Sequence, residues 1–159
     1  MNLRVGNGFD VHKLRKGKNI ILCGIKIPYK KELVGHSDAD VAMHALTDSI
    51  FGALCEGDIG IHFPPTEQQW KDVSSELFLE RALSLMFDRQ YAIMNIDLTI
   101  ICEGPKIKNH SLKMRTNIAR ICRINLDQVS IKGTTSEQLG FTGREEGIAT
   151  IATVLIKKG

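Results

Sequence analysis

The feature that most constrains the fold is an alternation of residue types near the start of the chain. Between residues 3 and 12, one set of alternate positions is large and apolar, and the other holds mainly glycines and polar side chains: Leu3, Val5, Phe9 and Val11 against Arg4, Gly6, Gly8, Asp10 and His12. A period of two is that of a β-strand, so the pattern predicts a strand from about Asn2 to His12. Asp10 and His12 then point to the same face of that strand.

A second stretch, residues 35–44, begins with a helix-start signal. Ser37 suits the N-cap, Asp40 is an acidic residue three positions later, and an apolar run follows, which together predict a helix over residues 38–54. His44 then lies about two turns into that helix. Asp10, His12 and His44 would form a set of two imidazoles and one carboxylate, which favours zinc over magnesium. Three protein ligands leave a fourth position open, as in catalytic zinc sites.

A simpler interpretation of each of these residues remains open. Asp10 and His12 can be polar residues on a solvated strand face, and His44 can be a core histidine that is hydrogen-bonded to Asp48, one helical turn later. In the metal hypothesis, Asp40 and Asp48 are instead candidate hydrogen-bond acceptors for the outer nitrogen of His44.

The chain length and the net charge limit the classes of protein to which this chain can belong. A chain of 159 residues suits a single domain, residues 1–159, with enough chain to bury a core. The net charge of +3 comes from scattered basic residues, so nothing predicts binding of nucleic acid or of an anionic membrane. No apolar run approaches the ~20 residues that span a bilayer, and no hydrophobic leader precedes the first strand. A basic cluster is predicted to lie in a solvated loop: Lys13, Arg15, Lys16 and Lys18.

The cysteines indicate a reducing compartment. All four are far apart and lie in apolar surroundings: Cys23, Cys55, Cys102 and Cys122. Without a C-x-x-C pair they are predicted to be buried free thiols, and the expected location is cytoplasmic.

The remaining periodicities predict one α+β domain, a two-layer sandwich with the helices on one face of the sheet. The predicted elements are a hairpin over residues 20–28, a polar connection over 30–35, an irregular loop over 58–66, helices over 75–87 and 108–122, and strands over 93–102, 128–132 and 148–157. The last strand is apolar or small on both faces, so we expect it in the interior of the sheet, with its outer face covered by another subunit.

Three short segments suit phosphate binding. His36 and Ser37 lie at a predicted helix start, where backbone N–H groups favour anions. Residues 134–137, Thr-Thr-Ser-Glu, put three hydroxyls and a carboxylate in one turn, and residues 104–106, Gly-Pro-Lys, form another. Each can also be an ordinary cap or polar turn. Together with the metal set, and with no Ser–His–Asp or Cys–His pair, they indicate phosphoryl chemistry that works by positioning and charge stabilisation.

The motifs occur in a distinctive order. They are Phe-Asp-Val-His at 9–12, Gly-His-Ser-Asp-Ala-Asp-Val at 35–41 followed by His44, Gly-Asp-Ile-Gly at 57–60, Phe-Pro at 63–64 and Lys-Gly-Thr-Thr-Ser-Glu-x-Leu-Gly-Phe-Thr-Gly-Arg at 132–144. Over essentially its whole length the chain resembles the 2-C-methyl-D-erythritol 2,4-cyclodiphosphate synthases of the non-mevalonate (MEP) isoprenoid pathway.

The resemblance implies a reaction and its cofactors. The substrate would be 4-diphosphocytidyl-2-C-methyl-D-erythritol 2-phosphate, whose 2-phosphate attacks the β-phosphorus and releases CMP. One zinc ion per subunit, or a similar divalent cation, would be held by Asp10, His12 and His44. Magnesium or manganese would accompany the diphosphate with Glu137 as its ligand. His36 and Thr135 match the transition-state stabilisers.

The family pattern also implies the substrate-binding residues and the assembly. The matching positions are Asp10, Val11 and His12; His36 and Ser37; Asp58, Ile59 and Gly60; Phe63, Pro64, Pro65, Thr66 and Glu67; Cys102, Glu103, Gly104, Pro105, Lys106, Ile107 and Lys108; Gly133, Thr134, Thr135, Ser136 and Glu137; and Phe141 with Arg144. Asp58 would accept hydrogen bonds from sugar hydroxyls. By resemblance the protein is a homotrimer with active sites at its interfaces, and residues 102–108 and 133–135 of a neighbouring subunit would bind the cytidine.

Two local features qualify the resemblance. Phe141, Arg144 and Glu146 match a cavity on the three-fold axis that holds an isoprenoid diphosphate in some members, although an Arg–Glu network alone would also explain the two charged residues. Pro65 stands where the family commonly has Asp, so any contact made by that carboxylate is absent here.

Two other functions use the same features. A zinc phosphohydrolase would use the three ligands to activate water and would need a general base beside the open position. A binding protein without activity would use only the axial cavity, and its binding would survive the loss of Asp10 and His44.

Overall fold

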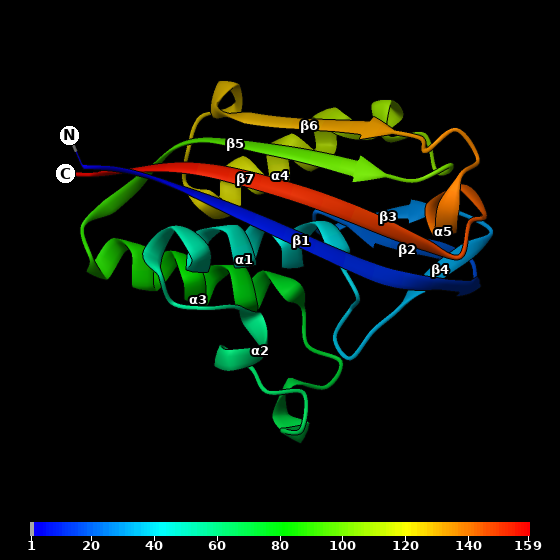
Figure 1. The fold of residues 1–159 in the computed structure, drawn as a ribbon, viewed down its shortest axis with the longest axis horizontal. Coiled ribbons are helices and arrows are strands. Elements are labelled where there is room, and N and C mark those ends of the chain that lie inside the picture. Colours follow the sequence, from blue (N-terminus) through cyan, green and yellow to red (C-terminus); the bar gives the residue numbers. More distant parts are fainter. Residues whose placement is uncertain (1) are drawn as a thin grey trace.

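The C-terminal strand lies at the centre of the sheet in the computed structural model, which describes residues 2–159 (Figure 1). The strand order is β4-β1-β7-β5-β6, and the bounds are Leu3–Lys16 for β1, Lys31–Val34 for β4, Tyr91–Ile101 for β5, Val129–Thr134 for β6 and Gly147–Lys158 for β7. Only β5 and β6 pair in parallel among these neighbours, so the sheet is mixed. The predicted interior position of the last strand is confirmed.

The predicted hairpin is also confirmed. Strands β2 (Asn19–Leu22) and β3 (Ile25–Pro28) form a separate antiparallel pair. Gly24 lies in its turn with φ +75°, a conformation that glycine adopts without steric cost.

The long helices lie together on one face of the sheet (Figure 1). They are α1 (Val41–Leu54), α3 (Ser75–Asp88) and α4 (Ser111–Cys122). The short elements are the one-turn helices α2 (Ile59–His62) and α5 (Gly140–Gly143) and the 3-10 turns η1 (Gln68–Trp70), η2 (Ile107–Asn109) and η3 (Leu126–Gln128). The predicted two-layer arrangement of sheet and helices is therefore confirmed. Within residues 2–159, no helix has both the length and the apolar character needed to cross a bilayer.

Glycines bring β1 unusually close to α1. A Cβ added at Gly8 would lie 2.0 Å from the carbonyl oxygen of Ala45, and one added at Gly6 would lie 1.8 Å from that of Ser49. The glycine face of β1 therefore packs on the helix. The apolar set of the same strand faces away from the helices, and Val5 and Phe9 remain 66% and 57% exposed.

Two predictions at this edge of the sheet are wrong. Strand β1 continues to Lys16, so the basic residues at 13, 15 and 16 lie on a strand, and the supposed polar connection contains β4. The cause is pairing that the local sequence does not reveal. Lys13 to Lys16 pair with β4, Leu14 is buried, and Arg15 forms a 2.6 Å ion pair with Glu32.

The predicted N-cap of the first helix is also wrong. Helix α1 begins at Val41, and Asp40 rather than Ser37 is its cap, with its carboxylate 3.0 Å from the backbone nitrogen of Met43. The same carboxylate accepts hydrogen bonds from the backbone N–H groups of Cys23 and Gly24. Burial raises the pKa of Asp40 to about 6, although the three N–H donors oppose the rise. Asp40 therefore joins the hairpin to the start of α1.

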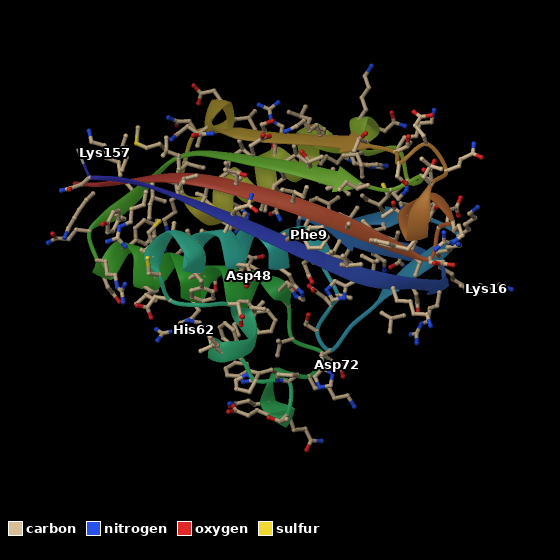
Figure 2. All side chains as sticks on the ribbon, viewed as in Figure 1. Phe9, Lys16, Asp48, His62, Asp72 and Lys157 are labelled. Carbon is tan, nitrogen blue, oxygen red and sulfur yellow. The ribbon has the colours of Figure 1, made fainter. Side chains whose placement is uncertain are left out.

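The segment after α1 is more regular than predicted. Residues 59–62 form α2, capped by Asp58, which accepts from the backbone N–H of Ile61 at 3.1 Å. Asp48 of α1 accepts a 2.7 Å hydrogen bond from the N–H of Ile59. Figure 2 shows Asp48 on α1 and His62 at the end of α2. The prolines at 64 and 65 still end the helix after one turn.

The prediction of four buried thiols is wrong at one position. Cys55 is exposed at the C-cap of α1 with φ +61°, while the other three cysteines are buried. Helices commonly end with a residue in the left-handed conformation, and Cys55 takes this role at the end of α1. Because this end of the helix lies at the surface, the thiol is exposed.

The thiols should therefore differ in reactivity. Burial raises the pKa of Cys102 to about 11 and that of Cys122 to about 12, and it also raises that of Cys23. Because the thiolate is the reactive form, we expect one thiol per chain to react quickly with a thiol reagent in the native protein and four in denaturant. The variant Cys55→Ser should lose the fast phase. Rapid labelling of two or more thiols in the folded protein would contradict the burial.

Candidate metal centre and active site

Asp10, His12 and His44 converge on one point between β1 and α1. Asp10 Oδ2 lies 2.9 Å from His12 Nε2 and 3.2 Å from His44 Nδ1, and the two nitrogens are 3.1 Å apart. The three side chains are 28%, 15% and 12% exposed, respectively. The predicted set is therefore assembled, and one atom from each residue lies within 4.8 Å of the others.

The outer nitrogens of both histidines are engaged away from this point. His12 Nδ1 lies 3.0 Å from the carbonyl oxygen of Val34, which can only accept, so Nδ1 carries a proton and Nε2 is bare when the ring is neutral. His44 Nε2 lies 2.8 Å from Ser75 Oγ and 3.0 Å from Ser37 Oγ. An imidazole whose outer nitrogen donates presents a lone pair to a metal.

The carboxylate supplies the third lone pair. Asp10 Oδ2 is a buried oxygen with no assigned hydrogen-bond partner within the described residues, and it faces the imidazole nitrogens of His12 and His44 at 2.9 and 3.2 Å. One carboxylate oxygen and two imidazole nitrogens that converge in this way can hold a cation in place of a proton. The residues therefore fit a divalent metal ion.

Charge within the group is consistent with this fit. Burial raises the pKa of Asp10, but the two imidazoles outweigh it and leave that pKa below its usual value. Burial lowers the pKa of His12, while the Asp10 carboxylate raises it, and the net change is upward. Without a cation, Asp10 therefore stays ionised and attracts a proton to His12, and binding of a metal ion would displace that proton.

The predicted acceptors for His44 are wrong. Asp40 caps α1, and Asp48 accepts the N–H of Ile59, so both carboxylates are used elsewhere. Ser75, at the start of α3, takes that place and donates its hydroxyl proton to Asp38. Neither Ser75 nor Asp38 was a candidate from the sequence. A serine just inside a helix start was the only available signal, and it is a common one.

His36 and Ser37 lie in the loop that precedes the cap of α1. The side chain of His36 is exposed, and its carbonyl oxygen accepts a 2.9 Å hydrogen bond from the N–H of Asp72. Asp72, labelled in Figure 2, ends the loop that precedes α3. The neighbours of His36 in this loop adjoin the metal group, because Gly35 packs against the ring of His12 and Ser37 Oγ lies 3.0 Å from His44 Nε2.

The segment from Phe63 to Glu67 is built on an aromatic cluster. The buried ring of Phe63 lies 4.5 Å from that of Phe78 and 4.9 Å from that of Trp70, measured between centroids. Glu67 accepts a 3.1 Å hydrogen bond from the indole of Trp70. Pro65 and Thr66 are exposed. The segment therefore forms a wall beside His44, whose ring is 5.8 Å from that of Phe78.

A separate cavity of about 460 Å³ contains most of the predicted cytidine-binding residues. It is lined by Cys102, Glu103, Pro105, Lys106, Ile107, Lys108, Ser111, Ile131, Lys132, Gly133, Thr134 and Thr135. Glu103 accepts hydrogen bonds from the N–H groups of Ser136 and Gln138, both at 3.2 Å. Glu103 therefore links the two predicted turns, residues 104–106 and 134–137, into one wall of the cavity. The side chain of Glu137 is exposed beside this wall.

The residues predicted for an axial cavity lie near α5. Arg144 forms an exposed ion pair with Glu146, with Arg144 Nε 3.1 Å from Glu146 Oε1. Phe141 is 39% exposed.

Val11, another predicted substrate-binding residue, faces away from the metal group, because alternate strand positions face opposite sides.

The fold and the site define an α+β protein with a candidate divalent-metal centre. The sequence profile of the YgbB family matches residues 3–157. The chain therefore belongs to the YgbB family.

Similar proteins fall into two lengths. The chain is 56% identical over 156 residues to the 2-C-methyl-D-erythritol 2,4-cyclodiphosphate synthase of Cereibacter sphaeroides, covering 98% of each chain. It is 55% identical over 158 residues to the bifunctional enzyme IspD/IspF of Ruegeria pomeroyi, covering 99% of this chain but 42% of that protein. A structure of Plasmodium falciparum IspF in complex with CDP aligns with a TM-score of 0.88 at 35% identity, covering 99% of this chain and 98% of that one.

Proposed function

We propose that this chain is a lyase that converts 4-diphosphocytidyl-2-C-methyl-D-erythritol 2-phosphate into 2-C-methyl-D-erythritol 2,4-cyclodiphosphate and CMP in the MEP pathway. The relatives that match it along their whole length have this activity in their name. The observation that carries the proposal is the convergence of Asp10, His12 and His44 in a family member that also has a nucleotide-sized cavity.

The proposed step is an internal phosphoryl transfer. An oxygen of the 2-phosphate forms a bond to the β-phosphorus, and the bond from that phosphorus to the oxygen bridging to CMP breaks. CMP leaves with the electron pair, so no external nucleophile is needed. This chemistry depends mainly on positioning and on stabilisation of charge.

Asp10, His12 and His44 would hold the first divalent cation, for which we propose zinc. When bound, the cation supplies Lewis acidity toward a phosphate oxygen. The chain's own groups do the rest. His36, exposed beside the metal group, donates a hydrogen bond to a phosphoryl oxygen, and Ser37 binds a second oxygen. Asp58 orients the sugar hydroxyls through the carboxylate oxygen that does not cap α2.

The second half of the site binds the nucleotide. All of residues 102–108 except Gly104, together with residues 133–135, line the cavity described above and would hold the cytidine, while Thr135 donates to a phosphate oxygen. Two relatives of known structure contain CDP, which supports this use. Glu137 would hold magnesium or manganese on the diphosphate, because carboxylate oxygen suits these hard cations.

We further propose a homotrimer with the active sites at its interfaces. The support is the sheet face opposite the helices, which carries exposed apolar side chains from three adjacent strands: Val5, Phe9, Val11, Met94 and Ile151. Phe9 and Ile151 are directly paired across β1 and β7. Several exposed apolar side chains on one sheet face favour a protein interface there, although the paired polar residues Asn7 and Thr153 lie among them. The axial cavity near Phe141 and Arg144 would admit an isoprenoid diphosphate, and free buried thiols favour a cytoplasmic location.

A charge on this face should break the assembly. We expect Phe9→Lys to shift the protein from trimer to monomer in sedimentation velocity, because the ammonium group would lose its water in an apolar interface. Leu112→Lys, an exposed apolar residue on α4, is the matched control and should remain trimeric. A Phe9→Lys trimer of unchanged stability would place the interface elsewhere.

The second cation can be tested at its proposed ligand. We expect Glu137→Gln to raise the magnesium concentration needed for half-maximal turnover by about tenfold or more, because an amide oxygen lacks the charge that attracts a hard cation. Zinc content should not change. Magnesium titrations of both proteins measure the effect, and identical curves would remove Glu137 from the second site.

Phosphorus NMR with the cytidyl substrate tests the function directly. We expect coupled signals of a cyclic diphosphate together with CMP, and the loss of both products when a chelator removes the first metal. A linear bisphosphate product would instead identify a phosphohydrolase. No turnover by protein with a full complement of zinc would favour the binding-only function or a segment disabled by Pro65.

A further inference from the structure

His44 contacts two groups through opposite sides of one ring. Its Nδ1 faces Asp10 and His12, while its Nε2 lies 2.8 Å from the hydroxyl of Ser75. Ser75 is fully buried, and its hydroxyl also contacts Asp38 Oδ1. His44, Ser75 and Asp38 therefore form a chain of contacts that leads from the metal group to a carboxylate in the loop before α1.

The acceptor at the end of this chain fixes the direction of its hydrogen bonds. Asp38 Oδ2 accepts the backbone N–H of Ser75 at 3.0 Å, and Oδ1 accepts that of Asp40 at 3.2 Å. A carboxylate surrounded by donors only accepts, so the single hydroxyl proton of Ser75 points to Asp38. The oxygen of Ser75 must then accept from His44, which places the ring proton on Nε2 and leaves Nδ1 bare.

Ser75 is not needed to cap its helix. Ser74 is the N-cap of α3 and accepts from the N–H of Glu76 at 3.3 Å. The hydroxyl of Ser75 points inward instead, and Asp38 is tied to the same segment by a 3.2 Å backbone hydrogen bond to Val73. Two neighbouring serines at one helix start thus face different partners, which separates helix capping from contact with His44.

We propose that Ser75 and Asp38 are positioning residues that hold His44 in the tautomer and orientation needed to bind the cation. They touch neither the cation nor the substrate. The inference rests on the proposed function, because it requires Asp10, His12 and His44 to bind a metal ion. It adds that the affinity of the site depends on α3 as well as on β1 and α1.

The first test is zinc affinity in the absence of substrate, measured on the whole chain by competition with a chelator. Loss of a partner that orients a metal-binding histidine typically weakens binding by about 10- to 100-fold, and we expect Ser75→Ala to fall in that range. Ser74→Ala is the matched control, because it removes a hydroxyl from the same helix start without touching His44. Its zinc affinity should equal that of the unaltered protein, although its helix is less stable.

Because Ser37 Oγ lies 3.0 Å from the same nitrogen, it can accept in place of Ser75. The double variant Ser37→Ala/Ser75→Ala should therefore bind zinc more weakly than Ser75→Ala alone. Asp38→Asn serves as a second route if Ser75→Ala does not fold. Its amide can donate to Ser75, which would let the hydroxyl turn toward His44 and favour the wrong tautomer.

The second test is independent of metal and of activity. Nitrogen-15 NMR of the metal-free protein should show His44 with its proton on Nε2, and a mixture of tautomers in Ser75→Ala or Asp38→Asn. Equal zinc affinity and an unchanged tautomer in both variants would overturn the positioning role. Absence of zinc binding by the unaltered protein would instead refute the proposed metal site, so the two failures are distinguishable.

Discussion

His44→Ala should lose the first metal ion and lower turnover by about a thousandfold or more, because it removes a ligand and with it the charge stabilisation that metal and site provide in the transition state. The other two ligands come from one strand and cannot enclose an ion on the side of α1. Metal content by elemental analysis and the phosphorus NMR assay measure both effects. The proposed trimer should not be affected, because His44 lies on the helix side of the sheet.

His110→Ala is the matched control for this experiment. His110 precedes α4, its side chain makes no capping hydrogen bond, and it lies outside both the metal group and the cavity lining. We expect its metal content and turnover to equal those of the unaltered protein. If His44→Ala kept full activity in buffer stripped of metal, the metal would have no role in catalysis.

The convergence of the three candidate metal ligands was predictable because each depends on a short-range pattern. The alternation along β1 shows that Asp10 and His12 share a face. Counting helical turns from the predicted helix start places His44 about two turns into the next helix. Neither step requires knowledge of which strands pair. The turns at 104–106 and 134–137 were candidates for phosphate binding from their residue types alone, but their role in a cytidine site came only through the family pattern, because such turns are common in every fold.

The surroundings of the ligands were not predictable in the same way. Ser75 is 31 residues from His44, and their contact exists only because α3 packs beside α1. The same holds for β4, whose pairing with the end of β1 determines that residues 31–34 are a strand. The sequence favoured Ser37 over Asp40 as the N-cap of α1, although serine and aspartate both cap helices. Only the contact of Asp40 with the hairpin identifies it as the cap.

Gly8→Ala should strongly lower the stability of the fold, because its Cβ would lie 2.0 Å from the carbonyl oxygen of Ala45 and 2.9 Å from the backbone nitrogen of Ser49. Both neighbours are backbone atoms of α1, so no side chain can turn away, and strand and helix must separate. Overpacking of this kind costs about 1–3 kcal/mol, and we expect Gly8→Ala at or above the upper end. Urea unfolding of the metal-free proteins at one protein concentration measures the change.

The same substitution tests whether the fold positions the site. Asp10 and His12 follow Gly8 on β1, and His44 adjoins Ala45 on α1, so separation of these elements should also weaken zinc binding. Gly52→Ala is the matched control, because its added Cβ would meet only the carbonyl oxygen of Asn7, at 3.7 Å. Alanine also favours a helix interior by up to about 1 kcal/mol over glycine, so Gly52→Ala should be neutral or stabilising. Equal stability and equal zinc affinity of the two variants would mean that close approach of β1 and α1 is not what aligns the three ligands.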